Sequence, residues 1–196
     1  MRRAVLLAAT ILLLNAGVCA ASVQSAQSSS VTIDQIGDSN LVIVDQSQGA
    51  GSATVDQNGD NNTATVTQQG AGFETAVLTQ AGNSNSISVL QDTGLNSATI
   101  YQNGAGDQAI LQQSSTVTGQ NTASLSQMGS YNTMSLVQNG AGNSATLSQT
   151  GSGDAQSVVQ TGSGNQVAYS QIGNNLPDLQ VRQSGGMSMT IVQTGH

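Results

Sequence analysis

Residues 57–68 read QNGDNNTATVTQ, a segment that begins and ends with glutamine. In its second half, threonine alternates with Ala64, Val66 and Gln68. A period of two places alternate side chains on the same face of a β-strand. Gly59 and the asparagines around it provide the backbone freedom that a tight turn needs. The segment therefore predicts one turn followed by one short strand.

The same glutamine interval runs through the whole chain. Glutamines recur every eleven residues, with one extra residue after Gln68 and three extra residues after Gln113. Arg182 occupies the register position that follows Gln171, and every other position is glutamine. So regular an interval indicates an internal repeat. The register glutamines are Gln35, Gln46, Gln57, Gln68, Gln80, Gln91, Gln102, Gln113, Gln127, Gln138, Gln149, Gln160, Gln171 and Gln193.

Two further residue types keep a fixed distance from these glutamines. Asparagine is the commonest residue six positions before, and glycine recurs two positions after. We expect asparagine to share the inward face with glutamine, and glycine to form the turn. The asparagines are Asn40, Asn62, Asn85, Asn96, Asn121, Asn132, Asn143 and Asn165. The turn glycines are Gly37, Gly59, Gly70, Gly82, Gly104, Gly129, Gly140, Gly151, Gly162 and Gly173.

One such strand cannot bury its apolar face alone, so consecutive units must pair. Two units give a coil of about 22 residues with two facing strands, and coils stack at a spacing of ~4.8 Å. The sequence therefore predicts an all-β fold, an amyloid-like two-sheet β-solenoid of about seven strand-turn-strand-turn coils over residues 31–195. Inside it, each stacked amide can donate to one neighbour and accept from the other, which makes an amide ladder.

The N-terminus has the pattern of a secretory signal peptide, residues 1–20. A basic start precedes an apolar run that ends at Leu14, and small residues lead up to Ala20. The run is too short to cross a bilayer as a helix, which takes ~20 apolar residues. Residues 21–30 are then expected to form a short N-terminal tail before the repeats.

The two ends of the repeat array differ in regularity. The last coil, residues 172–195, is expected to be irregular because Pro177, Asp178 and Arg182 depart from the repeat columns. This segment is either a cap or contact site, or a terminal repeat that has drifted, and both interpretations stay open. The first strand, residues 31–35, is regular, so we expect its open edge to pair with the far end of another molecule. Such a head-to-tail contact does not close and gives a filament.

These columns carry a resemblance to a known family. Gln57, Gly59, Asn62, Ala64 and Gln68 match the repeat of the curlin family, the subunits of curli fibres, at every position of the motif. The resemblance extends over nearly all of the expected mature chain because the motif recurs. The short tail before the repeats departs from the longer glycine-rich export segment of that family.

The resemblance implies a secreted structural subunit that polymerises into extracellular functional-amyloid fibres for biofilm matrix, adhesion and surface attachment. The implied location is a bacterial cell-surface fibre, reached by export through the periplasm. The implied partners are further copies of the chain in a head-to-tail homopolymer, a nucleator subunit, an outer-membrane export pore and periplasmic accessory proteins. A minor nucleator subunit and a monomeric β-solenoid surface adhesin remain alternative functions.

Composition argues against several other classes of function. Only 7% of residues are charged, with three Lys and Arg together and a net charge of −7. Nucleic-acid binding through phosphates needs many cations, so that function is excluded. The only histidine is His196 and there is no lysine, which leaves little for catalysis. We therefore expect no enzyme activity, no catalytic residue, no metal site and no cofactor.

Three acids stand just before register glutamines. Asp34, Asp45 and Asp56 are expected to point outward, with Asp34 and Asp56 one coil apart on the same sheet, about 5 Å from each other. Solvated charge that keeps the secreted monomer soluble is the favoured interpretation. The alternatives are gatekeeping against premature aggregation and a weak calcium site.

Overall fold

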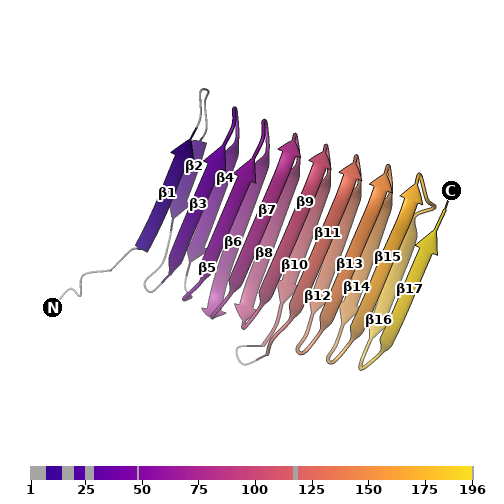
Figure 1. Cartoon of the computed structure of the whole chain (residues 1–196). Helices are drawn as coiled ribbons and strands as arrows, with labels where there is room; N and C mark the ends of the chain where they lie inside the picture. Colours follow the sequence, from indigo (N-terminus) through magenta and orange to yellow (C-terminus); the bar gives the residue numbers. More distant parts are fainter. Residues whose placement is uncertain (1–7, 15–19, 25–28, 48, 117–118, 196) are drawn as a thin grey trace.

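The computed structural model of the protein describes residues 8–14, 20–24, 29–47, 49–116 and 119–195. In these residues strands alternate between two parallel sheets, each turn carrying the chain from one sheet to the other (Figure 1). The first sheet contains, in spatial order, β1 (Ala8–Leu14), β3 (Ser30–Ile36), β5 (Ser52–Asn58), β7 (Thr75–Asn83), β9 (Ser97–Ala105), β11 (Thr122–Ser130), β13 (Ser144–Ser152), β15 (Gln166–Asn174) and β17 (Ser188–Thr194). The second contains β2 (Ala20–Gln24), β4 (Leu41–Ser47), β6 (Thr63–Gly72), β8 (Ser86–Gly94), β10 (Gln108–Ser114), β12 (Thr133–Asn139), β14 (Ala155–Thr161) and β16 (Leu179–Ser184).

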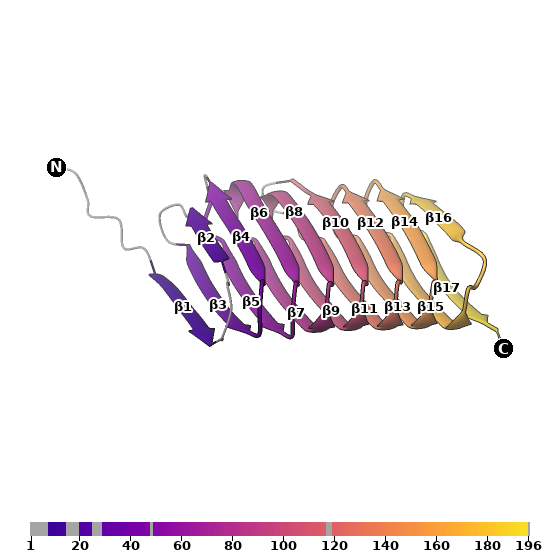
Figure 2. The same ribbon diagram turned by 90° about the horizontal axis from the view of Figure 1, so that it is seen from above.

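The two sheets lie face to face along one axis, with the two ends of the chain at opposite ends of the stack (Figure 2). Equivalent repeat positions pair across coils, as in Leu125 with Leu147 and Gln127 with Gln149. This arrangement confirms the predicted all-β, two-sheet solenoid of about seven coils. Over the described residues, no helix has the length and hydropathy that crossing a membrane requires.

Burial follows the two-residue period of the sequence. In β9, for example, Ala98, Ile100 and Gln102 are buried, whereas Thr99 and Tyr101 between them are exposed. The aliphatic positions of all coils form one continuous core, because each strand places them at the same height above its neighbour. The interior is therefore a thin apolar layer bordered by the glutamine positions.

The two insertions that interrupt the eleven-residue interval lie at or beyond the ends of strands of the second sheet. The extra residue after Gln68 falls where the β6–β8 pairing shifts register between Gln69 and Gly72. The extra residues after Gln113 follow β10; residues 117 and 118 of that turn lie outside the described part. Both turns leave strands of the second sheet, so the inward face of every later strand is preserved.

The N-terminal segment meets the first coil. Residues 1–7 and 15–19 of the expected signal peptide, and residues 25–28 of the expected tail, lie outside the described residues. The remaining residues form β1, which pairs with β3, and β2, which pairs with β4. In the full chain β3, the first repeat strand, is therefore not an open edge, since β1 covers it. An exposed strand edge readily accepts an extended apolar segment as a further strand. The division into signal peptide, tail and repeats remains a prediction.

Candidate functional site: the amide columns and the ends of the solenoid

The register glutamines form two columns of hydrogen-bonded amides, one along each sheet. In every step the Nε2 of one glutamine donates to the Oε1 of the glutamine in the next coil, at 2.7–3.0 Å. The first column begins with Gln35 donating to Gln57 and ends with Gln171 donating to Gln193. The second begins with Gln46 donating to Gln68. The structure thus brings all fourteen predicted glutamines into continuous columns.

The second hydrogen of most of these amides links the two sheets. Gln102 of β9 donates to the backbone carbonyl of Ser86, the first residue of β8, at 3.1 Å, and Gln113 of β10 donates to that of Ser97, the first residue of β9, at 3.1 Å. A glutamine inside the array therefore uses both donors and its acceptor, which is why a fully buried amide is tolerated at this position. Such a glutamine joins two neighbours in its own sheet and one strand of the opposite sheet.

The predicted asparagine column is wrong as an amide-to-amide ladder. The asparagines are buried, but most of their bonds go to the backbone. The Oδ1 of Asn62 accepts from the backbone N–H of Asn85 at 3.0 Å, and its Nδ2 donates to the carbonyl of Gly82 at 2.7 Å. One direct amide pair occurs among the described residues, from Asn165 to Asn143 at 2.9 Å. The asparagines therefore brace the turns of successive coils.

Acidic residues replace asparagine at three buried positions that the sequence analysis missed. Glu74, Asp107 and Asp154 each stand six residues before a register glutamine, and each is at most 2% exposed. The Oδ1 of Asp107 accepts the backbone N–H of Asn132 at 2.9 Å. Burial raises the pKa of Asp107 against the opposing effect of that bond. The spacing from the glutamine was the signal that could have identified these residues.

Glu74 is the most perturbed of the three acids. Burial raises its pKa to about 7; its own backbone N–H opposes this shift and the charge of Asp92 adds to it. Its Oε1 has no hydrogen-bond partner within the described part of the chain. Glutamate is one methylene longer than the asparagine it replaces, so it does not reproduce the bonds of the column.

The turn glycines that follow strands of the first sheet stack in a row from Gly37 to Gly173, where the backbones of successive coils approach closely. A Cβ on Gly129 would overlap the carbonyl of Gly151, and Gly129 has φ of +130°. The same Gly151 carbonyl accepts the Nδ2 of Asn132 at 3.0 Å. Glycine is therefore required at this row both by its backbone conformation and by the space beside the next coil.

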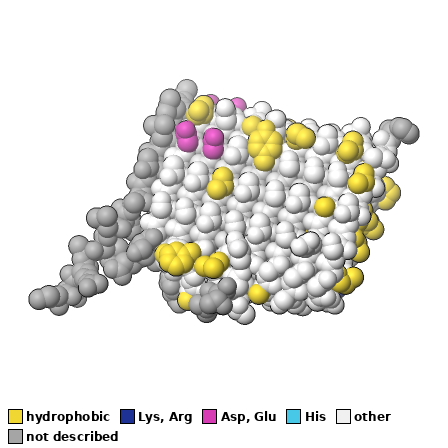
Figure 3. Space-filling view, turned by 60° about the horizontal axis from the view of Figure 1, so that its bottom comes forward, with side chains coloured by type: hydrophobic (Ala, Val, Ile, Leu, Met, Phe, Trp, Pro, Cys, Tyr) yellow, Lys and Arg dark blue, Asp and Glu magenta, His cyan; other side chains and the backbone are white. Residues whose placement is uncertain are grey.

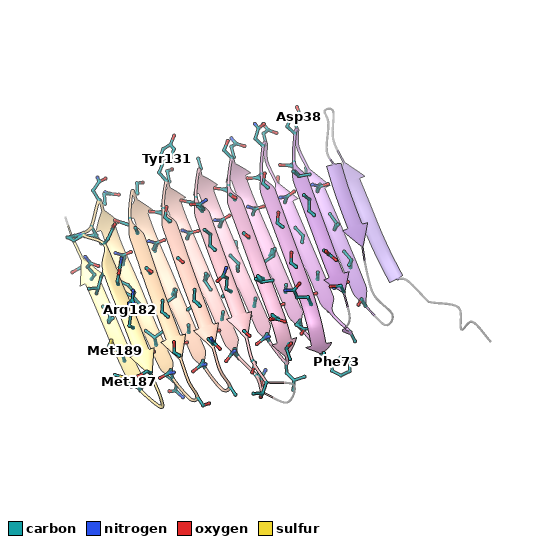
Figure 4. The ribbon with its side chains drawn as sticks, turned by 180° about the vertical axis from the view of Figure 1, so that it is seen from behind. Asp38, Phe73, Tyr131, Arg182, Met187 and Met189 are labelled. Carbon is teal, nitrogen blue, oxygen red and sulfur yellow. The ribbon has the colours of Figure 1, made fainter. Side chains whose placement is uncertain are left out.

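The last repeat contains a register shift that the sequence analysis placed wrongly. Gln183, and not Arg182, continues the second column, because Gln160 donates to it at 2.7 Å. The interval from Gln171 to Gln183, which contains Pro177, is one residue longer than the regular eleven, and the interval from Gln183 to Gln193 is one residue shorter. Arg182 consequently points outward and is exposed, while Val181 takes the buried position beside it. Figure 4 shows Arg182 near the C-terminal end of the stack.

The two ends of the glutamine columns differ chemically. At the N-terminal end, the Oε1 atoms of Gln35 and Gln46 are buried and have no hydrogen-bond partner among the described residues. At the C-terminal end, the side chains of Gln183 and Gln193 donate to backbone carbonyls: Gln183 to Gln166 at 2.8 Å and to Met187 at 3.4 Å, and Gln193 to Pro177 at 2.9 Å. The columns therefore begin with free acceptors and end with amide donors that have no further glutamine to bind.

The predicted outward acids lie near the N-terminal end. Asp34 of β3 is paired with Asp56 of β5, whereas Asp45 belongs to the other sheet. The pKa of Asp56 is raised by its partial burial and then by the charge of Asp34. Acidic side chains gather at this end of the face shown in Figure 3, while the rest of that face carries scattered apolar groups. Among the described residues, no three His, Cys, Asp or Glu lie close enough together to hold a metal ion.

Comparison with known proteins identifies the repeat. Two segments, residues 52–70 and 120–151, match the family model described as the curlin associated repeat. The first contains Gln57 and Gln68, and the second contains Gln127, Gln138 and Gln149, so the matched residues belong to the amide columns. A comparison with the curated proteins gave no match.

Proposed function

This chain belongs to the curlin family, and we propose that it is a secreted structural subunit that polymerises into extracellular, curli-type amyloid fibres. Curlin repeats are characteristic of the subunits of such fibres. Export through the periplasm, a place on the bacterial cell surface and a part in biofilm matrix and adhesion belong to the same proposal. So do the further partners: a nucleator subunit, an outer-membrane pore and periplasmic accessory proteins.

One observation carries the proposal: identical glutamines are hydrogen-bonded from coil to coil along the whole array, from Gln35 to Gln193. A column of this kind has no internal feature that limits its length. Ordinary solenoids seal their ends with polar capping repeats. Here β17 ends the first sheet with Met189 and Ile191 only partly buried against the core, so the last coil offers an unsealed strand to another molecule.

The acids of the first repeats fit this role. Asp34 and Asp56 place like charges on neighbouring strands of the first sheet, which disfavours close contact between incoming strands until the correct register is reached. We include solubility of the secreted monomer, and gatekeeping by Asp34, Asp45 and Asp56, in the proposed function.

Polymerisation of the purified mature protein, residues 21–196, tests the proposal. We expect fibres in negative-stain microscopy, amyloid-dye binding, and a lag phase that preformed seeds abolish. A matched variant, Gln102→Leu, keeps side-chain volume but interrupts one column, so its fibres should form more slowly. A protein that stays monomeric and dye-negative at every concentration, with or without seeds, would instead be a monomeric adhesin.

A further inference from the structure

Among the described residues the repeat array has an odd number of strands, and this parity determines how two copies can stack. Without β1 and β2, the described residues leave eight strands in the first sheet and seven in the second. The array begins with β3 and ends with β17, and both belong to the first sheet. The next position along the winding lies beyond β16, in the second sheet. A copy added in the same orientation would place its β3 on β17 and leave that position empty.

A half-turn about the solenoid axis removes this gap. The turned copy places its β3 on β16 and its β4 on β17, so the two sheets continue without a missing strand. Strands of the two sheets run in opposite directions around the coil (Figure 1), and a half-turn reverses strand direction. The new pairs therefore remain parallel, as every pair within the molecule is.

The hydrogen-bonding groups at the two ends fit this contact. With Gln183 set over Gln35 and Gln193 over Gln46, the terminal amides meet the two Oε1 acceptors that have no partner among the described residues. Gln183 then exchanges its long 3.4 Å bond to the Met187 carbonyl for a bond to Gln35. In the full chain, β1 places Leu13 opposite Gln35, and leucine carries no hydrogen-bond donor. The N-terminal segment therefore covers the edge of the first strand without completing its column.

Charge selects the half-turn over the untwisted contact. The residue before Gln183 is Arg182, and the residue before Gln35 is Asp34. When the two glutamines stack, the Arg182 guanidinium lies over Asp34, whose Oδ1 is buried and has no hydrogen-bond partner in the described residues. In the untwisted contact, Asp34 meets Val192 instead. Arg182 is the only cation that remains once the residues before the repeats are removed.

We infer that successive subunits of the fibre are related by a half-turn, with β16 of one copy paired to β3 of the next and β17 paired to β4, and with Arg182 bound to Asp34 across the junction. The inference rests on the proposed fibre function and on removal of residues 1–20, which takes away β1. Residues 21–24, the part of β2 that stays in the mature chain, pair with β4, so the incoming β17 must displace them. The buried positions also match, because Val181 falls over Ile33 and Ile191 falls over Val44. The partner is a second copy of this chain.

Engineered cysteine pairs test the junction directly. The mature chain has no cysteine, since the only one in the sequence is Cys19. Ile36, Ser184 and Thr194 are exposed strand-end positions one residue beyond the stacked glutamines. Stacked parallel strands place such residues about 5 Å apart, within the Cα–Cα range of a disulfide. We expect I36C/S184C fibres to give covalent oligomers after mild oxidation, and I36C/T194C fibres to remain monomeric when dissolved under non-reducing conditions.

The outcomes separate this inference from the proposed function. Crosslinking of I36C/T194C instead of I36C/S184C would overturn the half-turn while leaving the fibre in place, and so would fibres in which neither pair links. Failure of the unmodified mature chain to form any fibre would overturn the proposed function itself. Both cysteine variants are compared with the unmodified chain for dye binding and for seeded growth.

A charge exchange tests the ion pair across the junction. Arg182→Asp should slow seeded elongation roughly tenfold, because a like charge then meets Asp34. The double variant R182D/D34R should restore elongation to nearly the unmodified rate. R182D/D45R is the matched control, with the new arginine on β4 instead of β3, and should stay slow. Rescue by D45R and not by D34R would overturn the proposed pairing.

Discussion

The glutamine columns and the turn column of asparagines are both buried and both polar, yet they tolerate substitution differently. In the repeat array, from β3 to β17, every strand has a glutamine at the register position, including Gln183 where the sequence suggested Arg182. In the turn column, by contrast, Glu74, Asp107 and Asp154 take the place of asparagine. The two positions require different hydrogen bonds of their side chains.

A glutamine in the array must donate twice and accept once, whereas a turn asparagine is needed chiefly as an acceptor. Gln102 donates to Gln127 and to Ser86 and accepts from Gln80. The corresponding oxygen of the turn column accepts one backbone N–H, which a carboxylate does equally well, as Asp107 shows. Only an amide side chain can donate two hydrogen bonds and accept one at the same time. The glutamine positions therefore tolerate fewer residue types than the turn positions do.

The largest expected effect comes from placing a carboxylate in a glutamine column. Gln102→Glu removes two donors and points a buried charge at the Oε1 of Gln127 and at the Ser86 carbonyl. We expect a loss of about 3–5 kcal/mol in unfolding free energy at pH 7, measured by guanidinium denaturation followed by circular dichroism. Part of the loss should return near pH 5, because burial raises the pKa of such an acid and the neutral form regains one donor.

The matched substitution in the turn column should lower the free energy of unfolding much less. Asn62→Asp keeps the oxygen that accepts the backbone N–H of Asn85 and loses only the bond to the Gly82 carbonyl. Its column neighbours, Asn40 and Asn85, are uncharged. We expect a cost of about 1 kcal/mol. Equal losses in Gln102→Glu and Asn62→Asp would contradict the distinction between the two columns.

The glycine row is the strict part of the turns, and its replacement has the next largest effect. Gly129→Ala adds a methyl group that overlaps the Gly151 carbonyl and requires an unfavourable φ. We expect a loss of roughly 2–3 kcal/mol in the same denaturation experiment. Gly185→Ala is the control: its φ is +70° but no atom lies within 4 Å of the added Cβ, so it should cost only about 1 kcal/mol. A smaller loss of stability at Gly129 than at Gly185 would show that successive coils can move apart at the glycine row.

The glutamine columns could be predicted from the sequence because their chemistry and their period coincide. An amide recurring every eleven residues with an aliphatic residue two positions earlier permits few arrangements other than stacked strands. The two-sheet coil follows from the same pattern, since a single strand leaves its apolar face exposed. These features depend on residue type and spacing alone.

The turn bonds and the terminal register could not be predicted in the same way. Which atoms an asparagine binds depends on the backbone of the turn, including the positive φ of Asn61 and Ser84, and spacing does not fix that conformation. The shift from Arg182 to Gln183 arises from an insertion within a turn, which the interval alone does not locate. The apolar residue Val181, two positions before Gln183, was the available signal.

The buried acidic residue Glu74 of the turn column should make the free energy of unfolding depend on pH. The pKa of Glu74 is raised to about 7 from an ordinary value of 4.5, so between these values the folded state binds more protons than the unfolded state. Stability should therefore decrease as pH rises from 4.5 through 7. We expect a decrease on the order of 1 kcal/mol in unfolding free energy between pH 5 and pH 7.5 that is attributable to this group.

Glu74→Gln isolates that contribution, because it removes the titrating group and keeps the chain length. The variant should be more stable than the unmodified protein at pH 7.5 and nearly equal to it at pH 5. Asp107, whose pKa is also raised by burial, should account for part of the dependence that remains. An unchanged pH profile in Glu74→Gln would mean that the Glu74 carboxylate reaches water in the folded state.

The smallest expected effect concerns the end of the first column, where a tyrosine joins the amides. The Tyr169 hydroxyl donates to the Oε1 of Gln193 at 3.0 Å, and Gln171 donates to the same oxygen at 3.0 Å. Tyr169→Phe removes one of these two donors and leaves the ring in place, so we expect a loss of about 0.5–1 kcal/mol. Gln171→Leu, which removes the amide instead, should cost more because it leaves the Oε1 of Gln193 with one donor and also strips Gln149 of its acceptor. If Tyr169→Phe proved the more damaging variant, the terminal coil would be held by its tyrosine and not by the continuation of the column.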